Sequence, residues 1–284
     1  QDATPSSSAC TQLNVGCEAP QHQPIGLYYH ETVGIPEAAR IKAAEEAVDF
    51  DGVRIVGGSV ASLGQFPYLG GLVITLNSGL TSVCGSSLLS NTRLVTAAHC
   101  WFDGQNNARQ FTVVLGSVWL FWGGTRIATN QVEIHANYSP STLNNDIAII
   151  SVNWVPYSVN IQNIPIAVGT DQYAGLTATA AGFGRNAENA PITQSQAAAH
   201  VSMPVITNAA CASVFGAAIV IPSTICTNTA GGRSICGGDS GGPLAVGETL
   251  IGISTFVASA GCTLGFPAGF ARVTSFAPWI QARM

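Results

Sequence analysis

From Ile55 to the C-terminus, the sequence is a series of short apolar runs separated by turn-forming residues. The clearest runs are FPYLGGLVITL, FTVVLG, DIAIISV, LTATAAGFG and PLAVGETLIGISTF. Runs of this length, bounded by glycine, proline, asparagine and serine, are typical of β-strands joined by turns. The chain has 31 glycines, 14 prolines and only 9% charged residues, which disfavours long surface helices. We therefore predict an all-β fold for this part of the chain.

The size and charge of the chain limit its organisation and its partners. Its 284 residues, 47% of them hydrophobic, can bury a sizeable core in one large domain or two small lobes. Short helices are expected around residues 208–216 and at 273–284, where Phe276 and Ile280 share a face. No apolar run reaches about 18 residues, so we expect no membrane span. The net charge of −5, without a basic cluster, argues against nucleic acid and anionic membranes as partners.

Residues 1–54 differ from the rest of the chain. They hold eight of the fifteen acidic residues, a Ser/Pro-rich start and a helix-like stretch, PEAARIKAAEEAV (36–48), in which Ile41, Ala44 and Val48 recur at helical spacing. We interpret them as a segment attached to a domain. Because the chain begins at Gln1 without a methionine, a basic region or an apolar region, we also expect that a signal peptide has already been removed.

The cysteines and the basic residues indicate the environment. Eight cysteines, an even number, fit an oxidising compartment better than the cytosol. None forms a CxxC pair, which argues against zinc, and Glu133 is the only acid between Gly116 and His135, too few for calcium; we expect no metal and no cofactor. Lys42 is the only lysine, and all seven basic residues after Ile55 are arginines, which stay charged in strongly alkaline fluid. Compositional drift would explain this pattern equally well.

Three stretches contain the residue types of nucleophilic catalysis: TAAHC (96–100), NNDIAII (144–150) and GGDSGGP (237–243). A serine hydroxyl is a poor nucleophile, so it needs an adjacent base and a carboxylate that holds the base in the correct tautomer. Each stretch alone is a weak signal, because a serine between glycines is usually a turn and an aspartate before an apolar run is usually a cap. Together, in the order His99, Asp146 and Ser240, they predict a catalytic serine.

Four motifs, IVGG (55–58), TAAHC, DIAI (146–149) and GDSGGP (238–243), at these spacings resemble the chymotrypsin family of secreted serine proteases. The match covers essentially all of residues 55–284. The resemblance implies two packed six-stranded antiparallel β-barrels with a C-terminal helix, and a catalytic triad in the cleft between them. It implies that Ser240 attacks the scissile carbonyl, that His99 acts as general base and then general acid, and that Asp146 orients His99. The backbone N–H groups of Gly238 and Ser240 would form the oxyanion hole.

The same resemblance gives a role to Arg54. In this family, cleavage after a basic residue frees an Ile or Val α-ammonium group, which folds inward and pairs with the aspartate before the nucleophile, here Asp239. We therefore predict that Arg54–Ile55 is the activation bond, cut by a trypsin-like protease, that residues 1–54 are a propeptide, and that 55–284 form the protease domain. The alternative is that Arg54 is a linker charge without this role.

The resemblance also assigns six cysteines to three disulfides. These are Cys84–Cys100, Cys211–Cys226 and Cys236–Cys262. Cys10 and Cys17 remain, and their simplest pairing is with each other, in which case the propeptide would leave after cleavage. The propeptide lacks the six cysteines of the clip modules found on arthropod clotting and immune proteases, which disfavours a cascade enzyme.

Substrate preference is inferred from the positions that form the specificity pocket in this family. The floor position is Ser234, where trypsin-like members carry an aspartate, so specificity for Arg or Lys is disfavoured. The other positions assigned to the pocket are Thr255, Phe256, Val257 and Ala268. The extra methyl groups of the last two would narrow a slot meant for a flat ring. We favour a chymotrypsin-like preference for apolar and aromatic residues, with an elastase-like preference as the alternative.

The stretches SICGGDSGGP, CGSSLLSNTRLVTAAHCW and GFPAGFARV are similar to larval gut chymotrypsins of moths and related insects. This similarity implies a secreted, extracellular enzyme of the gut lumen that digests proteins and peptides, meets protein protease inhibitors and acts as a monomer. Two other readings stay open: a regulatory protease with one protein substrate, and an inactive protease homologue that serves as a binding module. The second usually requires loss of the nucleophile or the base, and both are present here.

Overall fold

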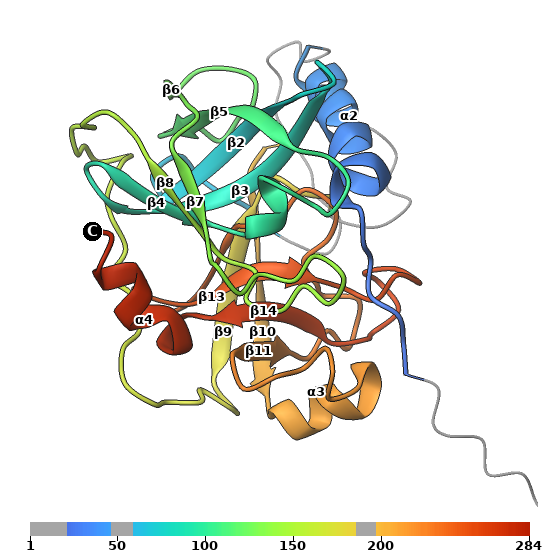
Figure 1. The fold of residues 1–284 in the computed structure, drawn as a ribbon. Helices are drawn as coiled ribbons and strands as arrows, with labels where there is room; N and C mark the ends of the chain where they lie inside the picture. The colour runs from blue at the N-terminus through green and yellow to red at the C-terminus, as the bar shows by residue number, and fades with distance from the viewer. Residues whose placement is uncertain (1–21, 47–58, 186–196) are drawn as a thin grey trace, which may run out of the picture.

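The computed structural model describes residues 22–46, 59–185 and 197–284. Two antiparallel sheets form two lobes that pack against each other, the first above the second in Figure 1. A buried core cluster contains side chains of both lobes, from Leu72 and Phe111 in the first to Phe270 and Ile280 in the second. The site predicted from the sequence lies where the lobes meet.

The first lobe is a sheet with the strand order β6-β5-β2-β3-β4-β8-β7. Its strands are β2 (Leu69–Leu76), β3 (Thr81–Ser90), β4 (Arg93–Thr96), β5 (Ala108–Leu115), β6 (Thr125–Thr129), β7 (Val132–Ile134) and β8 (Ala148–Ser151). On β2, Leu72, Ile74 and Leu76 alternate with other residues and are buried, as the period of two in a strand requires.

The second lobe has the strand order β1-β10-β11-β14-β13-β12-β9. Its strands are β1 (Ser59–Val60), β9 (Thr177–Gly182), β10 (Ala199–Ile206), β11 (Thr224–Thr227), β12 (Pro243–Val246), β13 (Thr249–Phe256) and β14 (Ala268–Arg272). Strand β9 pairs with both β10 and β12, which closes six of these strands into a barrel. The short β1 adds a seventh strand at the edge of β10.

The predicted all-β fold of two packed lobes is confirmed. The second lobe is the closed six-stranded barrel that the resemblance implied. The first lobe differs: it has seven strands, and among the described residues no pairing joins its edge strands β6 and β7 into a closed barrel.

Both helices predicted within the β-rich part are present. Helix α3 (Asn208–Phe215) begins after Thr207, whose side chain accepts a hydrogen bond from Ala210 N. Helix α4 (Val273–Gln281) buries Phe276 and Ile280 on one face. In the part of the chain that the structure describes, no helix is long and apolar enough to cross a membrane.

Three disulfides brace the two lobes. They are Cys84–Cys100 in the first lobe, and Cys211–Cys226 and Cys236–Cys262 in the second, which are the pairs that the resemblance implied. The predicted pairing of Cys10 with Cys17 lies outside the described residues.

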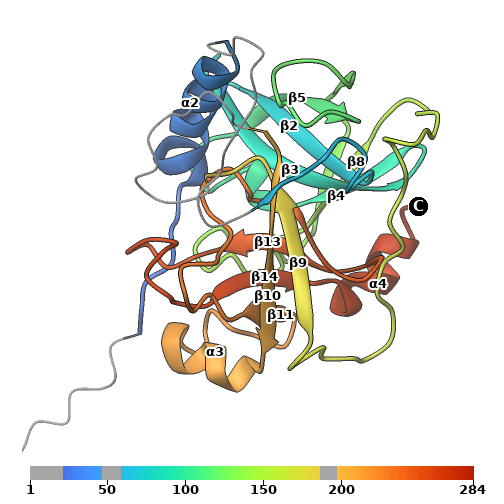
Figure 2. The ribbon, with the colours of Figure 1, turned by 180° about the vertical axis from the view of Figure 1, so that it is seen from behind.

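Residues 22–46, called the N-terminal segment below, lie against both lobes. The segment first runs along the second lobe, and then forms η1 (His30–Gly34) and α2 (Ile35–Glu46) beside β2 and β3 of the first (Figures 1 and 2). The helix predicted from the spacing of Ile41 and Ala44 is therefore present, and both side chains are fully buried.

Candidate active site

His99 and Asp146 come from neighbouring parts of the first lobe. His99 lies in η2 (Ala98–Cys100), which follows β4, and Asp146 precedes β8, the strand that pairs with β4. Asp146 Oδ2 accepts a hydrogen bond of 2.7 Å from His99 Nδ1, and its Oδ1 accepts one of 2.8 Å from His99 N. Both residues are buried. Because a carboxylate only accepts, this contact places a proton on Nδ1 and leaves Nε2 free to accept another.

Ser240 lies on the turn that leads into β12, and this turn joins the two lobes. Its carbonyl oxygen accepts a hydrogen bond of 2.7 Å from Gly85 N on β3, and Gly241 N donates one of 2.8 Å to Ser254 O on β13. Gly238, two residues before Ser240, has a φ of 98°, which side-chain-bearing residues rarely adopt. The glycines of GGDSGGP therefore allow a sharp turn whose backbone is held from both sides.

His99 Nε2 is buried and has no hydrogen-bond partner among the described residues. The ring of Tyr29, from the N-terminal segment, packs against His99 with 4.8 Å between ring centroids. Burial raises the pKa of the Tyr29 hydroxyl far above its usual value, and the nearby charge of Glu37 raises it further. Hydrogen bonding with Ser240 and with the backbone of Gly238 lowers this pKa, but by less. Tyr29 thus contacts the predicted base and lies beside the predicted nucleophile and oxyanion hole.

Asp239 is partly buried next to Ser240. Its Oδ1 accepts a hydrogen bond of 2.8 Å from Gly184 N, and its Oδ2 accepts one of 2.9 Å from Cys236 N. Burial nevertheless raises the pKa of Asp239 to about 6, although both hydrogen bonds lower it. The surroundings of this carboxylate therefore do not compensate fully for its loss of solvent.

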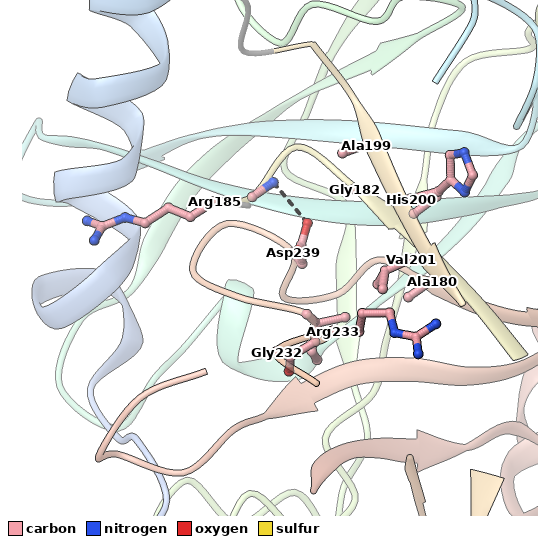
Figure 3. A pocket seen from close by; sticks show the side chains of 13 residues that line it. Ala180, Gly182, Arg185, Ala199, His200, Val201, Gly232, Arg233 and Asp239 are labelled. Carbon is pink, nitrogen blue, oxygen red and sulfur yellow. Dashed lines mark hydrogen bonds between the residues drawn. The ribbon is translucent and has the colours of Figure 1, made fainter. Parts of the chain in front are cut away.

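A pocket opens beside Asp239 (Figure 3). Strands β9 and β10 and residues 232–235 line it, and Figure 3 shows Arg185 pointing away from Asp239 toward helix α2. Strand β1 reaches the edge of this pocket, because Ser59 pairs with His200 and Val60 pairs with Ala199, and both partners line it.

The predicted specificity residues are placed in three ways. Thr255, Phe256 and Val257 line one cavity together with Ser240 and with residues of the N-terminal segment. Ser234 lines the pocket beside Asp239 instead, and its buried hydroxyl has no hydrogen-bond partner in the described chain. Ala268 is fully buried in β14.

One residue group with closely spaced metal-ligand atoms occurs in the described residues: Cys84, His99 and Cys100. The two cysteines form a disulfide, so their sulfurs are not thiolates that a metal could bind.

The contribution of the N-terminal segment to this site was not predicted from the sequence. Neither Tyr29 nor His30 had been given a role. The available signal was the YYH triplet (28–30), a cluster of ring side chains directly before the predicted helix. Its target could not be identified, because His99 is about seventy residues away in the sequence.

Comparison with known proteins identifies the family. The Trypsin family model matches residues 55–280. Among curated proteins, a collagenase of Hypoderma lineatum is 38% identical over 233 residues, covering 80% of this chain and 86% of the relative. Brachyurin of Leptuca pugilator is 36% identical, covering 81% and 98% respectively. An alkaline trypsin, "Trypsin, alkaline B", of Manduca sexta is 34% identical, covering 84% and 94%.

A solved structure agrees with these relatives. The HL collagenase structure superimposes with a TM-score of 0.75 at 37% identity, covering 81% of this chain and 98% of that one. The family model matches most of the chain. The relatives are more than 30% identical over most of their length, so the chain shares a common ancestor with them. The chain belongs to the trypsin family of serine proteases and is a serine endopeptidase.

Proposed function

We propose that the chain is a secreted zymogen that, after cleavage at Arg54–Ile55, hydrolyses peptide bonds following apolar or aromatic residues. The observation that carries the proposal is the state of the site. His99 and Asp146 are already paired, whereas His99 Nε2 has no described partner and Tyr29 packs against the ring. A site whose base is oriented but has the ring of Tyr29 packed against it is what a latent protease requires.

The chemistry follows from the proposed roles. Ser240 Oγ attacks the scissile carbonyl, and His99 Nε2 takes its proton and then gives it to the leaving amine. Asp146 holds the imidazole by its hydrogen bond with Nδ1 and stabilises the imidazolium, and its second hydrogen bond, from His99 N, fixes the backbone. The N–H groups of Gly238 and Ser240 bind the oxyanion, and loss of one such donor typically costs about 3 kcal/mol of barrier.

Activation uses Asp239. The pKa of its carboxyl is raised, so an ammonium group placed beside it would stabilise the charged form. Ile55 is four residues before Ser59, and four extended residues span at most about 14 Å. Since β1 holds Ser59 beside His200, which lines the Asp239 pocket, a new N-terminus at Ile55 would have this length of chain with which to approach the carboxylate.

The preference for apolar residues rests on Ser234 and Val257. Ser234 lines the pocket beside Asp239 in this structure. At the floor position that the resemblance assigns to it, its neutral hydroxyl would offer no partner to an arginine or lysine side chain, because a buried cation needs an opposite charge. Val257 lines the cavity next to Ser240 and adds apolar surface. The same valine reduces the room for a ring, which favours an elastase-like preference for small residues as the second candidate.

Secretion and the gut lumen belong to this proposal too. Three disulfides are typical of an oxidising compartment. The Manduca sexta relative is named an alkaline trypsin. This is in keeping with the basic residues of the present chain, which are almost all arginine and so stay charged at high pH. The partners would be dietary proteins, an activating trypsin-like protease and protein protease inhibitors, with the enzyme itself a monomer.

The test is to assay the purified chain before and after limited cleavage with immobilised trypsin, using peptides that end in Phe, Leu, Ala or Arg. N-terminal sequencing should find Ile55, with hydrolysis after Phe or Leu appearing in parallel. An Arg54→Gln chain should stay latent, and a Ser240→Ala chain should be cleaved but inactive. Hydrolysis only after Ala would favour the elastase-like candidate. Cleavage at Arg54 without hydrolysis of any peptide would refute the proposal and favour a regulatory or binding role.

A further inference from the structure

We propose that the N-terminal segment, residues 22–46, is a peptide inhibitor of this protease, which occupies the substrate cleft and inhibits the activated enzyme in trans after it is released. This inference rests on the proposed function of Arg54 as the activation site. The proposed function explains activation by the pairing of a new N-terminus with Asp239. The present proposal adds that the segment itself inhibits the enzyme.

The first part of the segment binds as an added strand. Ile25 forms an antiparallel bridge with Ala258, beyond the end of β13. Ser259 N donates to Pro24 O at 2.9 Å, and Gly26 N donates to Val257 O at 3.4 Å. An extended peptide that pairs with an exposed edge in this way is a common mode of peptide recognition. The edge is next to Thr255 and Phe256, so the segment covers the wall of the cavity that contains Ser240.

The chain then turns before a peptide bond can be presented to Ser240. Tyr28 has a φ of 57°, a left-handed conformation that tyrosine rarely adopts. The Thr32 hydroxyl donates to the carbonyl oxygens of Leu27 and Tyr28, at 3.2 and 3.0 Å. These hydrogen bonds turn the backbone at Leu27 and Tyr28 back toward the segment's own Thr32. The segment therefore leaves the extended path of a substrate at this point.

Tyr29 and His30 then bind beside the catalytic groups. The Tyr29 hydroxyl donates to Val83 O at 2.8 Å, and its ring lies on His99. His30 is fully buried: its backbone N donates to Asp103 Oδ2 at 2.8 Å, and its Nδ1 lies 2.9 Å from Ser82 Oγ. These contacts fix the aromatic pair from both sides.

Close packing at the start of the helix adds to this fit. Gly34 lies so near Ser82 and Tyr29 that a Cβ at this position would overlap both side chains. A larger residue here would have to displace Ser82 of the protease, so the segment fits the protease this closely only with glycine, although glycine lowers intrinsic helix stability.

Helix α2 anchors the segment at three points. The buried carboxylate of Glu37 forms ion pairs with Arg40 and with Arg185 of the second lobe. Glu45 accepts hydrogen bonds from the backbone N–H groups of Leu120 and Phe121, at 2.6 and 2.7 Å. Between them, Ile41 is fully buried in a cluster that includes side chains of the first lobe. A helix that served only as a linker would expose its charged residues, whereas here two of its three acidic groups are bound by the protease.

The Tyr28–Tyr29 pair supplies a matched test. Tyr28 is 45% exposed, whereas Tyr29 is partly buried and packs on His99. A peptide of residues 22–46 is added to the activated, purified enzyme, and inhibition is measured on the peptide substrate that the enzyme hydrolyses fastest. Binding of a fluorescent version is measured by anisotropy on an activated Ser240→Ala chain. We expect inhibition and binding at or below about 100 μM for the native peptide. The Tyr29→Ala peptide should bind at least about 100-fold more weakly, and the Tyr28→Ala peptide should stay within about threefold of native.

The full-length chain gives the same comparison without a synthetic peptide. After cleavage at Arg54, the activity of the native chain should rise when the released segment is removed by gel filtration. The Tyr29→Ala chain should reach full activity immediately on cleavage, and the Tyr28→Ala chain should behave like the native one.

Failure of the inference can be told apart from failure of the proposed function. If the activated enzyme is active but the peptide neither binds nor inhibits, the inference is wrong. Rapid cleavage of the peptide after Leu27 or Tyr28, found by mass spectrometry, would also overturn it, because the segment would then be a substrate. If the activated chain hydrolyses no peptide at all, the proposed function is wrong, while anisotropy on the Ser240→Ala chain still decides whether the segment binds.

Discussion

Lowering the pH from about 8 to about 5 should weaken binding of the N-terminal segment through His30. Burial lowers the pKa of His30 to about 4, from an ordinary value of 6.5; nearby Asp103 opposes the shift, and His99 adds to it. The docked segment therefore excludes a proton that the free segment takes up. The contribution of His30 is fully present above the ordinary pKa and is lost as the pH falls from there through the docked value.

The magnitude follows from the two pKa values. A histidine with a pKa of 6.5 when free and about 4 when docked changes the dissociation constant by about 30-fold at pH 5, or about 2 kcal/mol. Between pH 8 and 7 the change should be within about twofold. Glu45 acts in the opposite direction, because burial raises the pKa of its carboxyl and protonation then favours docking.

The assay is anisotropy of the labelled 22–46 peptide on an activated Ser240→Ala chain, for the native and the His30→Asn peptides. Asparagine can still hydrogen-bond to Ser82 but does not titrate. Glu45 and Asp103 are present in both experiments, so the difference between the two pH profiles isolates His30. If the His30→Asn peptide loses as much affinity as the native one between pH 8 and 5, the reasoning is refuted.

Four further outcomes are expected. Ser240→Ala should lower kcat of the activated enzyme by about 10⁶ in hydrolysis assays, without a change in circular dichroism. Asp239→Asn should lower kcat/KM at least about 100-fold in a chain shown by sequencing to begin at Ile55, because the buried ammonium loses its partner. Val257→Gly should raise the ratio of kcat/KM for Phe over Ala peptides by about 10-fold or more. Above pH 10 the native peptide should bind progressively more weakly, since burial raises the pKa of the docked Tyr29 hydroxyl, and a Tyr29→Phe peptide should not show this loss.

Local motifs predicted one contact of the site that the structure contains, the pairing of His99 with Asp146. TAAHC and GDSGGP could be recognised without tertiary structure, because their glycine and histidine content is unusual, and the catalytic roles of His99 and Ser240 stay predictions. The cysteine pairs followed from the same resemblance. In each case, the chemistry of the residue and its immediate neighbours was enough.

The rest depends on contacts between distant parts of the chain. Ile41 and Ala44 revealed a helix by their spacing, but spacing does not say which surface buries that helix. Glu37 looked like an ordinary exposed acid at the start of a helix, and only the structure pairs it with Arg185 in a buried site. The resemblance assigned Ser234 to the floor of the specificity pocket, and in this structure Ser234 lines the pocket beside Asp239, so its role in the active enzyme stays a prediction.

The two proposed controls on activity, at Asp239 and at the cleft, are physically connected. Gly184 N holds Asp239, and the next residue, Arg185, holds Glu37 of the segment and donates its backbone N–H to Gly237 O. Cleavage at Arg54 breaks none of these contacts by itself. What it changes is concentration: a covalently attached segment competes at an effective concentration of about millimolar, whereas a released one competes only at its free concentration. A segment that binds in the micromolar range would therefore keep the enzyme inhibited where the zymogen is stored and cleaved at high concentration. It would release the enzyme on dilution into the fluid where the substrate is.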